Sequence, residues 1–336
     1  MKLGIFVNDV ATEKPEYTTT RLAMAAVNRG HEVWYTGAGD FAYDPDDTLR
    51  AQASRAEGGH TDLAEFLGSL KPERFTVEEL DVLWLRSDPA DDLPDRTWAQ
   101  PVGILFGGLA GRRGVMVVND PAGLSLALNK LYLHHFPAEV RPATLITRDP
   151  GEVADFVEGH GGRAVIKPLQ GSGGHGVFIV SEDDTANLDQ MIDAVTRDGY
   201  LIAQEQLPAA ADGDTRLFLL DGKPLQCDGV YAAFRRVPSE GEARANMTAG
   251  ASVEAADVDD TMLHLAEMVG PRLAEDGMFL AGLDIVGDRI LEINVFSPGG
   301  LGSVESLTGV DFNEIVVAAL ERKVSCYGDA DRRSSP

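Results

Sequence analysis

Residues 282–298 constrain the fold more than any other stretch of the chain, because they have the pattern of a β-hairpin. Two short apolar runs flank residues 287–289, and apolar runs joined by a short glycine-containing segment are typical of paired antiparallel strands. Side chains alternate between the two faces of a strand. A two-residue turn would put Asp284 and Glu292 on opposite faces. We therefore expect a three-residue loop that pairs them on one face, with Val286 opposite Ile290.

This face of the expected hairpin would carry an unusual group of polar side chains. Asn294 would lie beside Asp284 and Glu292, while apolar side chains fill the other face. Like charges opposite each other on paired strands are destabilising. A hard cation offsets such repulsion, and Mg²⁺ held by one or two carboxylates and substrate phosphates fits best. A solvated hairpin edge explains the same residues, and the motif alone leaves both interpretations open.

Composition excludes several classes of protein. The 336 residues are enough for two or three compact units, and 29 basic against 54 acidic residues give a net charge of −25. This charge argues against nucleic-acid binding, which needs a basic surface. The two cysteines, Cys227 and Cys326, show no C-x-x-C spacing, which indicates a reducing compartment. The chain shows neither a signal-peptide pattern nor a long apolar segment, so we expect a cytoplasmic protein without membrane partners.

The N-terminal third has the pattern of a parallel α/β sheet. Strands are expected at 3–7 and 31–35 with a helix at 18–29 between them, an order that favours parallel pairing. A strand at 80–85 runs directly into Arg86. Ligands of open α/β sheets lie beyond the carboxyl ends of strands, so Arg86 is a candidate anchor for an anionic ligand. A surface arginine paired with Asp88 or Asp91 is the alternative.

Helical patterns follow at four places further along the chain. We expect helices at 123–136, 150–158 with Asp149 as N-cap, 259–275 with a kink or interruption at Pro271, and 312–323. The tail 329–336 is expected to be disordered.

A glycine-rich loop lies between two apolar β runs, at 164–168 and 177–180. Its glycines, which include Gly171, Gly173 and Gly174, let backbone N–H groups approach an anion closely. Lys167, at the end of the first run, can add its charge to the same phosphates. The loop is neither a Walker loop, because G-K-[ST] is absent, nor a dinucleotide-binding fingerprint, because a strand follows the glycines. A plain glycine hairpin is the alternative.

A second polar loop spans residues 238–250 and includes Arg244 and Asn246. It is rich in Gly, Ser, Glu and Arg, a composition typical of a loop that closes over an active site.

The order of these motifs resembles the ATP-grasp superfamily and, over nearly the whole chain, the bacterial glutathione synthetases. The resemblance is carried by an ordered set of short motifs: L-R-x-D-P at 85–89, V-N-x-P at 118–121, I-K-P-L-x-G-x-G-G at 166–174, D-G-D at 212–214, G-L-D-I-V-G-D-R at 282–289 and E-I-N-V-x-S-P at 292–298. It implies an α/β chain with an ATP-grasp fold in three units. These are an N-terminal domain with a parallel sheet (1–120), a small lid with the glycine loop (121–200) and a C-terminal domain with the hairpin (201–328).

The resemblance also implies roles for individual residues. ATP would be bound by Lys130, Lys167, Gly171, Gly173 and Gly174 at the phosphates, by Gln204, Glu205 and Leu207 at the adenine, and by Asp214 at the ribose. Asp284, Glu292 and Asn294 would hold Mg²⁺, with Mn²⁺ as a substitute. Arg86, Arg236, Arg244 and Asn246 would bind the second substrate. The developing charge would be met by Arg216, Arg236 and Arg244.

The implied activity is an ATP-dependent carboxylate–amine ligase that forms an acyl phosphate, with γ-glutamylcysteine and glycine as favoured substrates and a homodimer or homotetramer as its assembly. The sequence departs from the family pattern in a longer segment at 223–235, in Phe296 and in the glycines of 299–302. We expect those glycines to leave room for a larger acceptor, so another small amine stays open beside glycine. Two other classes stay open, a kinase on the same fold and an ATP-binding module without turnover.

Overall fold

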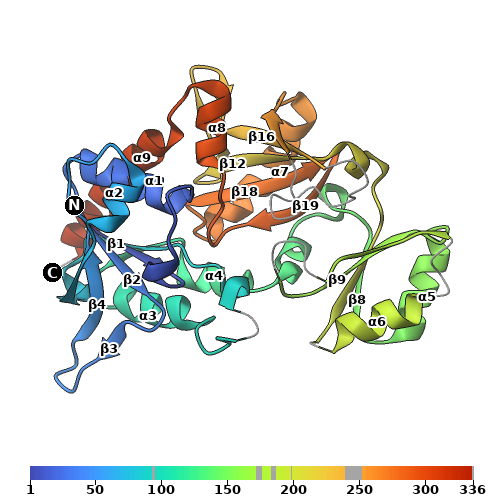
Figure 1. The fold of residues 1–336 in the computed structure, drawn as a ribbon, viewed down its shortest axis with the longest axis horizontal. Helices are drawn as coiled ribbons and strands as arrows, with labels where there is room; N and C mark the ends of the chain where they lie inside the picture. Colours follow the sequence, from blue (N-terminus) through green and yellow to red (C-terminus); the bar gives the residue numbers. More distant parts are fainter. Residues whose placement is uncertain (93–94, 172–175, 183–186, 198, 239–251, 335–336) are drawn as a thin grey trace.

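A computed structural model places the chain in three larger sheets with helices packed on them (Figure 1). It describes all residues except 93–94, 172–175, 183–186, 198, 239–251 and 335–336. The N-terminal sheet lies at one end of the molecule, the small sheet at the other, and the C-terminal sheet between and above them in Figure 1. This arrangement brings three separate parts of the chain to one central region.

The N-terminal sheet has the strand order β3-β4-β2-β1-β6-β7, with β5 paired to β4. Its strands are β1 (Lys2–Val7), β2 (Glu32–Gly37), β3 (Phe41–Tyr43), β4 (Leu49–Arg55), β5 (Lys71–Thr76), β6 (Val82–Leu85) and β7 (Met116–Val118). Strands β2, β1, β6 and β7 are parallel, as the sequence predicts. The antiparallel strands β3, β4 and β5 widen the sheet in a region where the sequence analysis placed no element.

Helices cover both faces of this sheet. They are α1 (Thr18–Asn28), α2 (Leu63–Gly68), α3 (Val102–Gly111) and α4 (Pro121–Leu126). Along β1, Leu3 and Ile5 pack with α1, whereas Phe6 points to the opposite face and packs with α3. This alternation is what a strand buried on both faces requires.

The single helix expected at 123–136 is wrong. Helix α4 begins earlier, because the Asp120 carboxylate accepts hydrogen bonds from the backbone N–H groups of Ala122 and Gly123. A separate 3₁₀ helix covers Lys130–His135, where the Asn129 side chain accepts from Leu131 N. The Asn129 side chain thus caps the start of a second helix that is separate from α4. Lys130 is the first residue of this second helix.

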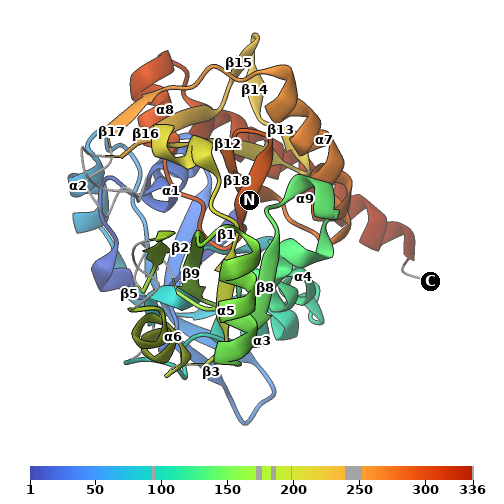
Figure 2. The ribbon, with the colours of Figure 1, turned by 90° about the vertical axis from the view of Figure 1, so that its right-hand side faces the viewer.

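The small sheet is antiparallel in the order β10-β9-β11-β8 and faces the viewer in Figure 2. Its elements are β8 (Thr144–Thr147), α5 (Pro150–Gly159), β9 (Ala164–Pro168), β10 (Phe178–Val180), α6 (Leu188–Thr196) and β11 (Leu201–Gln204). Asp149 caps α5 as expected, accepting from Gly151 N and Glu152 N. Strand β11, which follows the expected boundary at residue 200, belongs to this sheet.

The C-terminal sheet has the order β17-β16-β12-β18-β19, with β13 paired to β12. Its strands are β12 (Asp214–Leu220), β13 (Lys223–Pro224), β16 (Ala233–Val237), β17 (Ser252–Ala255), β18 (Leu280–Val286) and β19 (Arg289–Asn294), with a separate ribbon of β14 (Gln226–Cys227) and β15 (Val230–Tyr231). Three helices accompany it: α7 (Asp260–Glu275), α8 (Leu301–Thr308) and α9 (Phe312–Ser334).

Two expectations about these helices need correction. The interruption expected at Pro271 is wrong, because helix α7 is continuous through this residue. Helix α9 continues to Ser334 through most of the tail that the sequence analysis expected to be disordered. The segment 329–334 contains neither glycine nor proline, the two residues that most disfavour a helix.

The β18–β19 hairpin pairs Asp284 with Glu292 and Gly282 with Asn294, as expected, but by a different route. Its turn has two residues, because Val286 pairs with Arg289, and the expected pairing of Val286 with Ile290 is wrong. The register shifts beyond Asp284, which leaves Leu291 as an extra residue on β19. A β-bulge of this kind moves the following side chains to the other face. The bulge therefore restores the polar face that a two-residue turn alone would have broken.

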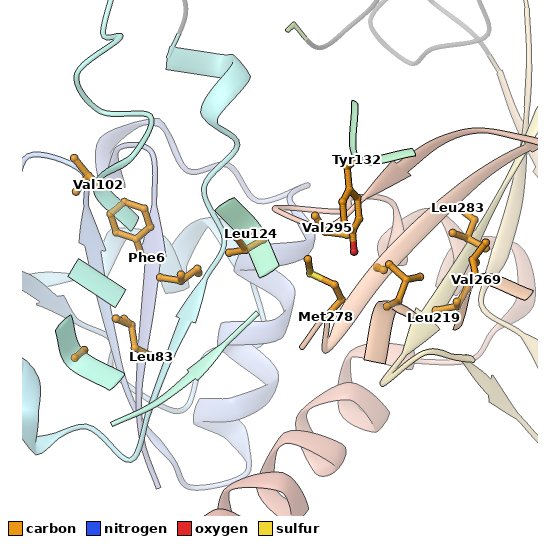
Figure 3. Packing of buried hydrophobic residues seen from close by; sticks show 14 of the residues in the cluster. Phe6, Leu83, Val102, Leu124, Tyr132, Leu219, Val269, Met278, Leu283 and Val295 are labelled. Carbon is orange, nitrogen blue, oxygen red and sulfur yellow. The ribbon is translucent and has the colours of Figure 1, made fainter. Parts of the chain in front are cut away.

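The hydrophobic cores divide the molecule unequally. One buried cluster runs from the N-terminal sheet to the C-terminal sheet, passing through Leu124, Met278 and Val295 (Figure 3). A second cluster joins α1 and β1 to α8, α9 and β12. The small sheet has a cluster of its own with α5 and α6. The first and last sheets therefore form one packed body, and the small sheet forms a separate one.

Candidate active site

An ion-pair network lies on the polar face of the C-terminal sheet. Arg216 on β12 binds Asp284 on β18 with two hydrogen bonds, Nε and Nη2 each being 2.7 Å from a carboxylate oxygen. Arg236 on β16 lies with Nη2 2.8 Å from the same carboxylate and also pairs with Asp214 on β12. These strands are neighbours, so their same-face side chains meet. Burial alone would raise the pKa of Asp284, but the two arginines hold it below its ordinary value.

Glu292 is the more accessible carboxylate of the hairpin, with 41% of its side chain exposed. Its Oε1 lies 3.4 Å from the Lys130 ammonium, which also donates a hydrogen bond to the Gly171 carbonyl. The Lys130 backbone N–H donates to the Leu169 carbonyl at 3.1 Å. Lys130 therefore connects the start of the glycine loop with the polar face of the hairpin.

Lys167 lies at the end of β9 and is the second ammonium group of the region. Its Nζ donates to Gln204 Oε1 at 2.9 Å, and Gln204 Nε2 donates in turn to Thr144 Oγ1 at 3.2 Å. Burial lowers the pKa of Lys167 to about 8, while Glu292 opposes this shift and Lys130 adds to it. The effects of Lys130 and Glu292 on Lys167 place the three side chains in one electrostatic environment.

The residues expected around the adenine and ribose follow β11. Glu205 is tied to the start of the small sheet, because its N–H donates to the Ala143 carbonyl and its carboxylate accepts from Ala143 N at 3.2 Å. Leu207 precedes the 3₁₀ helix Pro208–Asp212. Asp214, expected at the ribose, is engaged by Arg236.

Arg86 is buried, with 3% of its surface exposed, at the carboxyl end of β6. Its Nε donates to Thr19 Oγ1 and its Nη2 to the Pro298 carbonyl, both at 3.2 Å, and its guanidinium lies over the Trp84 ring. Burial lowers the pKa of Arg86 to about 10, and the nearby carboxylate of Glu13 opposes this shift. Arg86 thus holds the segment that follows Asn294 against the N-terminal sheet.

The segment 296–302 is fixed by contacts from both sheets. Gly299 O accepts from Arg216 Nη1 at 3.3 Å, and Thr18 Oγ1 accepts from the N–H groups of Gly300 and Leu301 at 3.0 and 3.2 Å. Thr18 is the first residue of α1, so it caps the start of α8 from a distant part of the chain.

The glycines of this segment differ in the space around them. A Cβ at Gly300 would lie 2.3 Å from Phe234 Cε1, and one at Gly302 would lie 2.5 Å from Arg21 Nε. A Cβ at Gly299 would meet nothing within 4 Å. Two of the three glycines therefore allow close packing, and the expectation that they make the site roomier is not supported at these two positions.

Several expected site residues lie outside the part of the chain that the structure describes. They are Gly173, Gly174, Arg244 and Asn246, together with nearly all of the expected lid at 238–250.

Asn119 is a buried residue where the N-terminal sheet meets the C-terminal sheet, and the sequence analysis gave it no role. It follows β7, and its side chain bonds to the backbone at Phe279, Leu280 and Val295. The motif V-N-x-P contained it, but the only available signal was a carboxamide directly after a buried strand.

The residues of the hairpin face fit a Mg²⁺ ion by their chemistry. Asp284, Glu292 and Asn294 offer carboxylate and amide oxygens, the ligands that this cation prefers. Asn294 Nδ2 lies 3.2 Å from Asp284 Oδ2, so its carbonyl oxygen is directed elsewhere. Among the described residues, no group of three or more His, Cys, Asp or Glu side chains is arranged so that it could hold a metal ion.

Comparison with solved structures identifies the fold. The chain is similar to D-cycloserine synthetase DcsG, with a TM-score of 0.67 and 16% identity over 96% of this chain and 100% of that one. It is also similar to the ATP-grasp ligase PsnB in complex with a minimal precursor, Mg and ADP, with a TM-score of 0.58 and 18% identity over 96% of this chain and 98% of that one. The fold is therefore that of the ATP-grasp enzymes, as expected.

Comparison of sequences is more specific. The family model for the prokaryotic glutathione synthetase N-terminal domain matches residues 1–125, and the model for the ATP-grasp domain of the same family matches 129–309. The glutathione synthetase of Gloeobacter violaceus is 35% identical over 94% of this chain and 95% of its own length. That of Agrobacterium fabrum is 36% identical over 91% of each. The chain belongs to the prokaryotic glutathione synthetase family, which confirms the resemblance.

None of the helices in the described part of the chain combines the length and apolar character that a bilayer span requires.

Proposed function

We propose that the chain is an ATP- and Mg²⁺-dependent ligase that joins γ-glutamylcysteine to glycine through an acyl phosphate. The observation that carries this proposal is the position of Lys130. It binds the Gly171 carbonyl at the start of the glycine loop and lies 3.4 Å from Glu292 on the hairpin. Terminal phosphates of ATP that bind between the glycine loop and the hairpin would therefore lie close to the positive charge of Lys130.

In the proposed reaction, a carboxylate oxygen of γ-glutamylcysteine attacks the γ-phosphorus of ATP, and ADP leaves. The glycine amine then attacks the acyl carbon, and inorganic phosphate leaves. Lys130 and Lys167 would hold the phosphates in line. Arg216, which binds the Gly299 carbonyl and Asp284, is proposed to face the tetrahedral oxyanion.

Asp284, Glu292 and Asn294 are proposed to hold Mg²⁺, with Mn²⁺ as a substitute. When bound, the ion would neutralise charge on the transferred phosphoryl group. Glu292 is accessible for this role without rearrangement. Asp284 already binds two arginines, so it would have to bind the ion through the lone pairs that the arginines leave free.

The carboxylate substrate is proposed to be bound by Arg86 and Arg236, with Arg244 and Asn246 from the segment outside the described residues acting as part of a closing lid. The nucleotide would lie between the small sheet and the C-terminal sheet, with Gln204, Glu205 and Leu207 at the adenine and Asp214 at the ribose. The separate core of the small sheet supports a unit that moves as one body.

Glycine is favoured as the acceptor, because the space beside Gly300 and Gly302 is filled by Phe234 and Arg21. Another small amine is the second candidate, since the space beside Gly299 is open. A kinase is less well supported, because buried arginines near the site suit a carboxylate better than a neutral alcohol. We further propose a cytoplasmic homodimer or homotetramer, an assembly that sedimentation of the purified chain would determine.

The test is a competition experiment with products resolved by mass. The chain is supplied with ATP, Mg²⁺, γ-glutamylcysteine and a mixture of glycine, alanine, serine and β-alanine. Glutathione, ADP and phosphate are the expected products. Pyrophosphate would refute the acyl-phosphate route, and bound ATP without coupling to any amine would refute the ligase activity for these substrates.

A further inference from the structure

Asn119 connects the N-terminal sheet to the open end of the β18–β19 hairpin. It follows β7, and 1% of its surface is exposed. Its Nδ2 donates to the carbonyls of Val295 and, at 3.2 Å, Leu280. Its Oδ1 accepts from Phe279 N at 2.8 Å and from Leu280 N at 3.2 Å. Both ends of the carboxamide are therefore fully engaged by the backbone of the other domain.

These bonds begin where the pairing of the hairpin ends. The last pair of the ladder is Gly282 with Asn294, and beyond it β18 and the segment after β19 share no further pairs. Asn119 bridges Leu280 and Val295 across this gap. Val295 directly follows Asn294, so a side chain from the N-terminal domain sets the position of the backbone next to a proposed metal ligand.

The surrounding joint is tightly packed and leaves little room for adjustment. A Cβ at Gly123 would lie 1.9 Å from the Asp276 carbonyl oxygen, and one at Gly277 would lie 2.4 Å from the Cβ of Asp120. The Asp120 N–H donates to the Gly277 carbonyl at 3.1 Å. Figure 3 shows Leu124, Met278 and Val295 at this junction, and all three belong to one buried apolar cluster. In such a closely packed interface, a shift of one segment displaces the segment packed against it.

We propose that Asn119 is a positioning residue of the phosphoryl-transfer site, which acts by holding Asn294 in register with Asp284 and Glu292. The inference rests on the proposed Mg²⁺ site and extends it into the N-terminal domain. Groups that orient a metal ligand without touching the metal typically change its affinity by about 10- to 100-fold when they are removed. A residue that only fills space at a domain junction would lower stability without changing the response to Mg²⁺.

The test uses the full chain and compares Asn119→Ala with Tyr132→Phe. Tyr132 donates from its hydroxyl to Asp276 Oδ2 at 2.8 Å, so Tyr132→Phe removes a partly buried hydrogen bond of the same junction that does not involve Val295. ADP binding is measured by calorimetry with and without Mg²⁺, at a temperature where each variant is folded. We expect Asn119→Ala to lose about tenfold or more of the enhancement that Mg²⁺ gives to ADP binding. Tyr132→Phe should keep the wild-type enhancement.

A double-mutant cycle identifies the route of the effect. If Asn119 acts through Asn294, Asn119→Ala combined with Asn294→Ala should reduce the Mg²⁺ enhancement no further than Asn294→Ala alone. Additive losses, or a wild-type Mg²⁺ response in Asn119→Ala, would overturn the proposal. Should Asn119→Ala not fold, Asn119→Ser carries the same test, since its hydroxyl can replace only part of the carboxamide bonds.

The same data separate this inference from the proposed function. Wild-type ADP binding that does not respond to Mg²⁺ would reject the metal site itself. A normal wild-type response that is unchanged in the Asn119 variants would reject only the positioning role.

Discussion

Arg216 and Asp284 form a buried bidentate ion pair, with both hydrogen bonds at 2.7 Å, across the neighbouring strands β12 and β18. The two residues were expected to act separately, one at the oxyanion and the other at the metal. Their pairing shows that the protein's own side chains offset charge on the polar hairpin face. Arg216 and Arg236 offset the charge of Asp284, and Lys130 offsets that of Glu292.

The first prediction concerns removal of the metal. Because basic side chains already offset both carboxylates, chelation of divalent ions should leave the Tm of the nucleotide-free chain unchanged. With ADP present, Mg²⁺ should raise the Tm, because a ligand at 100 times its Kd stabilises the native state by about 2.7 kcal/mol. Differential scanning calorimetry with EDTA or Mg²⁺, with and without ADP, checks both parts. A drop in Tm on chelation alone would show that the cation is needed for the fold.

The second prediction concerns Glu292→Gln, which keeps the shape of the side chain and removes its charge. Turnover should fall by about 100-fold or more, because the charge stabilisation by a metal is worth several kcal/mol. Stability should change little, since the contact of Glu292 with Lys130 is partly exposed and such pairs contribute about 0–1 kcal/mol.

Asp288→Asn is the matched control for this variant. It makes the same charge change in the turn of the same hairpin, where 71% of the Asp288 side chain is exposed. Steady-state ADP release should be unchanged in this control. Full activity in Glu292→Gln would remove Glu292 from the metal ligands.

The third prediction concerns pH. Burial lowers the pKa of Lys167 to about 8 in the nucleotide-free chain. The charged ammonium is the form that binds phosphate, so the contribution of Lys167 to ATP affinity should be constant below pH 8. Above pH 8 the ATP affinity should decline, with a slope that approaches about tenfold per pH unit, because binding must then take up a proton. Lys167→Arg should abolish this decline, since its guanidinium stays charged. A decline of the same slope in both proteins would assign the titration to another group.

The fourth prediction compares two neighbouring glycines. Gly300 has a φ of +113° and no space for a Cβ beside Phe234, so Gly300→Ala should cost about 1–3 kcal/mol of unfolding free energy. Gly299→Ala should cost within about 0.5 kcal/mol, because its Cβ would enter open space. Urea denaturation measures both. Equal destabilisation would mean that the segment 296–302 adjusts as a whole.

The hairpin illustrates what the sequence can predict. The alternation of polar and apolar residues was enough to place Asp284 beside Glu292, because the apolar side chains of both strands must share the buried face for any length of turn. The two-residue turn and the bulge at Leu291 were not predictable, since two routes lead to the same pairing and they differ only in local backbone geometry. The parallel strands and the Asp149 cap were predicted for the same reason as the polar face: each follows from a local pattern.

Relationships between distant segments were not predictable. The pairing of Arg216 with Asp284, the bonds of Asn119 and the cap that Thr18 provides for α8 all join residues far apart in the chain. No periodicity or spacing reports such contacts. The break after α4 was missed for a local reason, because the apolar pattern of a helix outweighed the capping tendency of Asn129.

Helix α9 has a consequence for the synthesis of the chain. It packs on α1, where Arg29 binds Glu321 and Glu314, and its apolar side chains share a cluster with β1. Helix α9 is thus synthesised long after β1 and α1, with which it shares this apolar cluster. At about 5–20 residues per second, the interval between them is on the order of tens of seconds. Throughout that time the apolar cluster of α1 and β1 is incompletely covered, and it is completed only when α9 has left the ribosome.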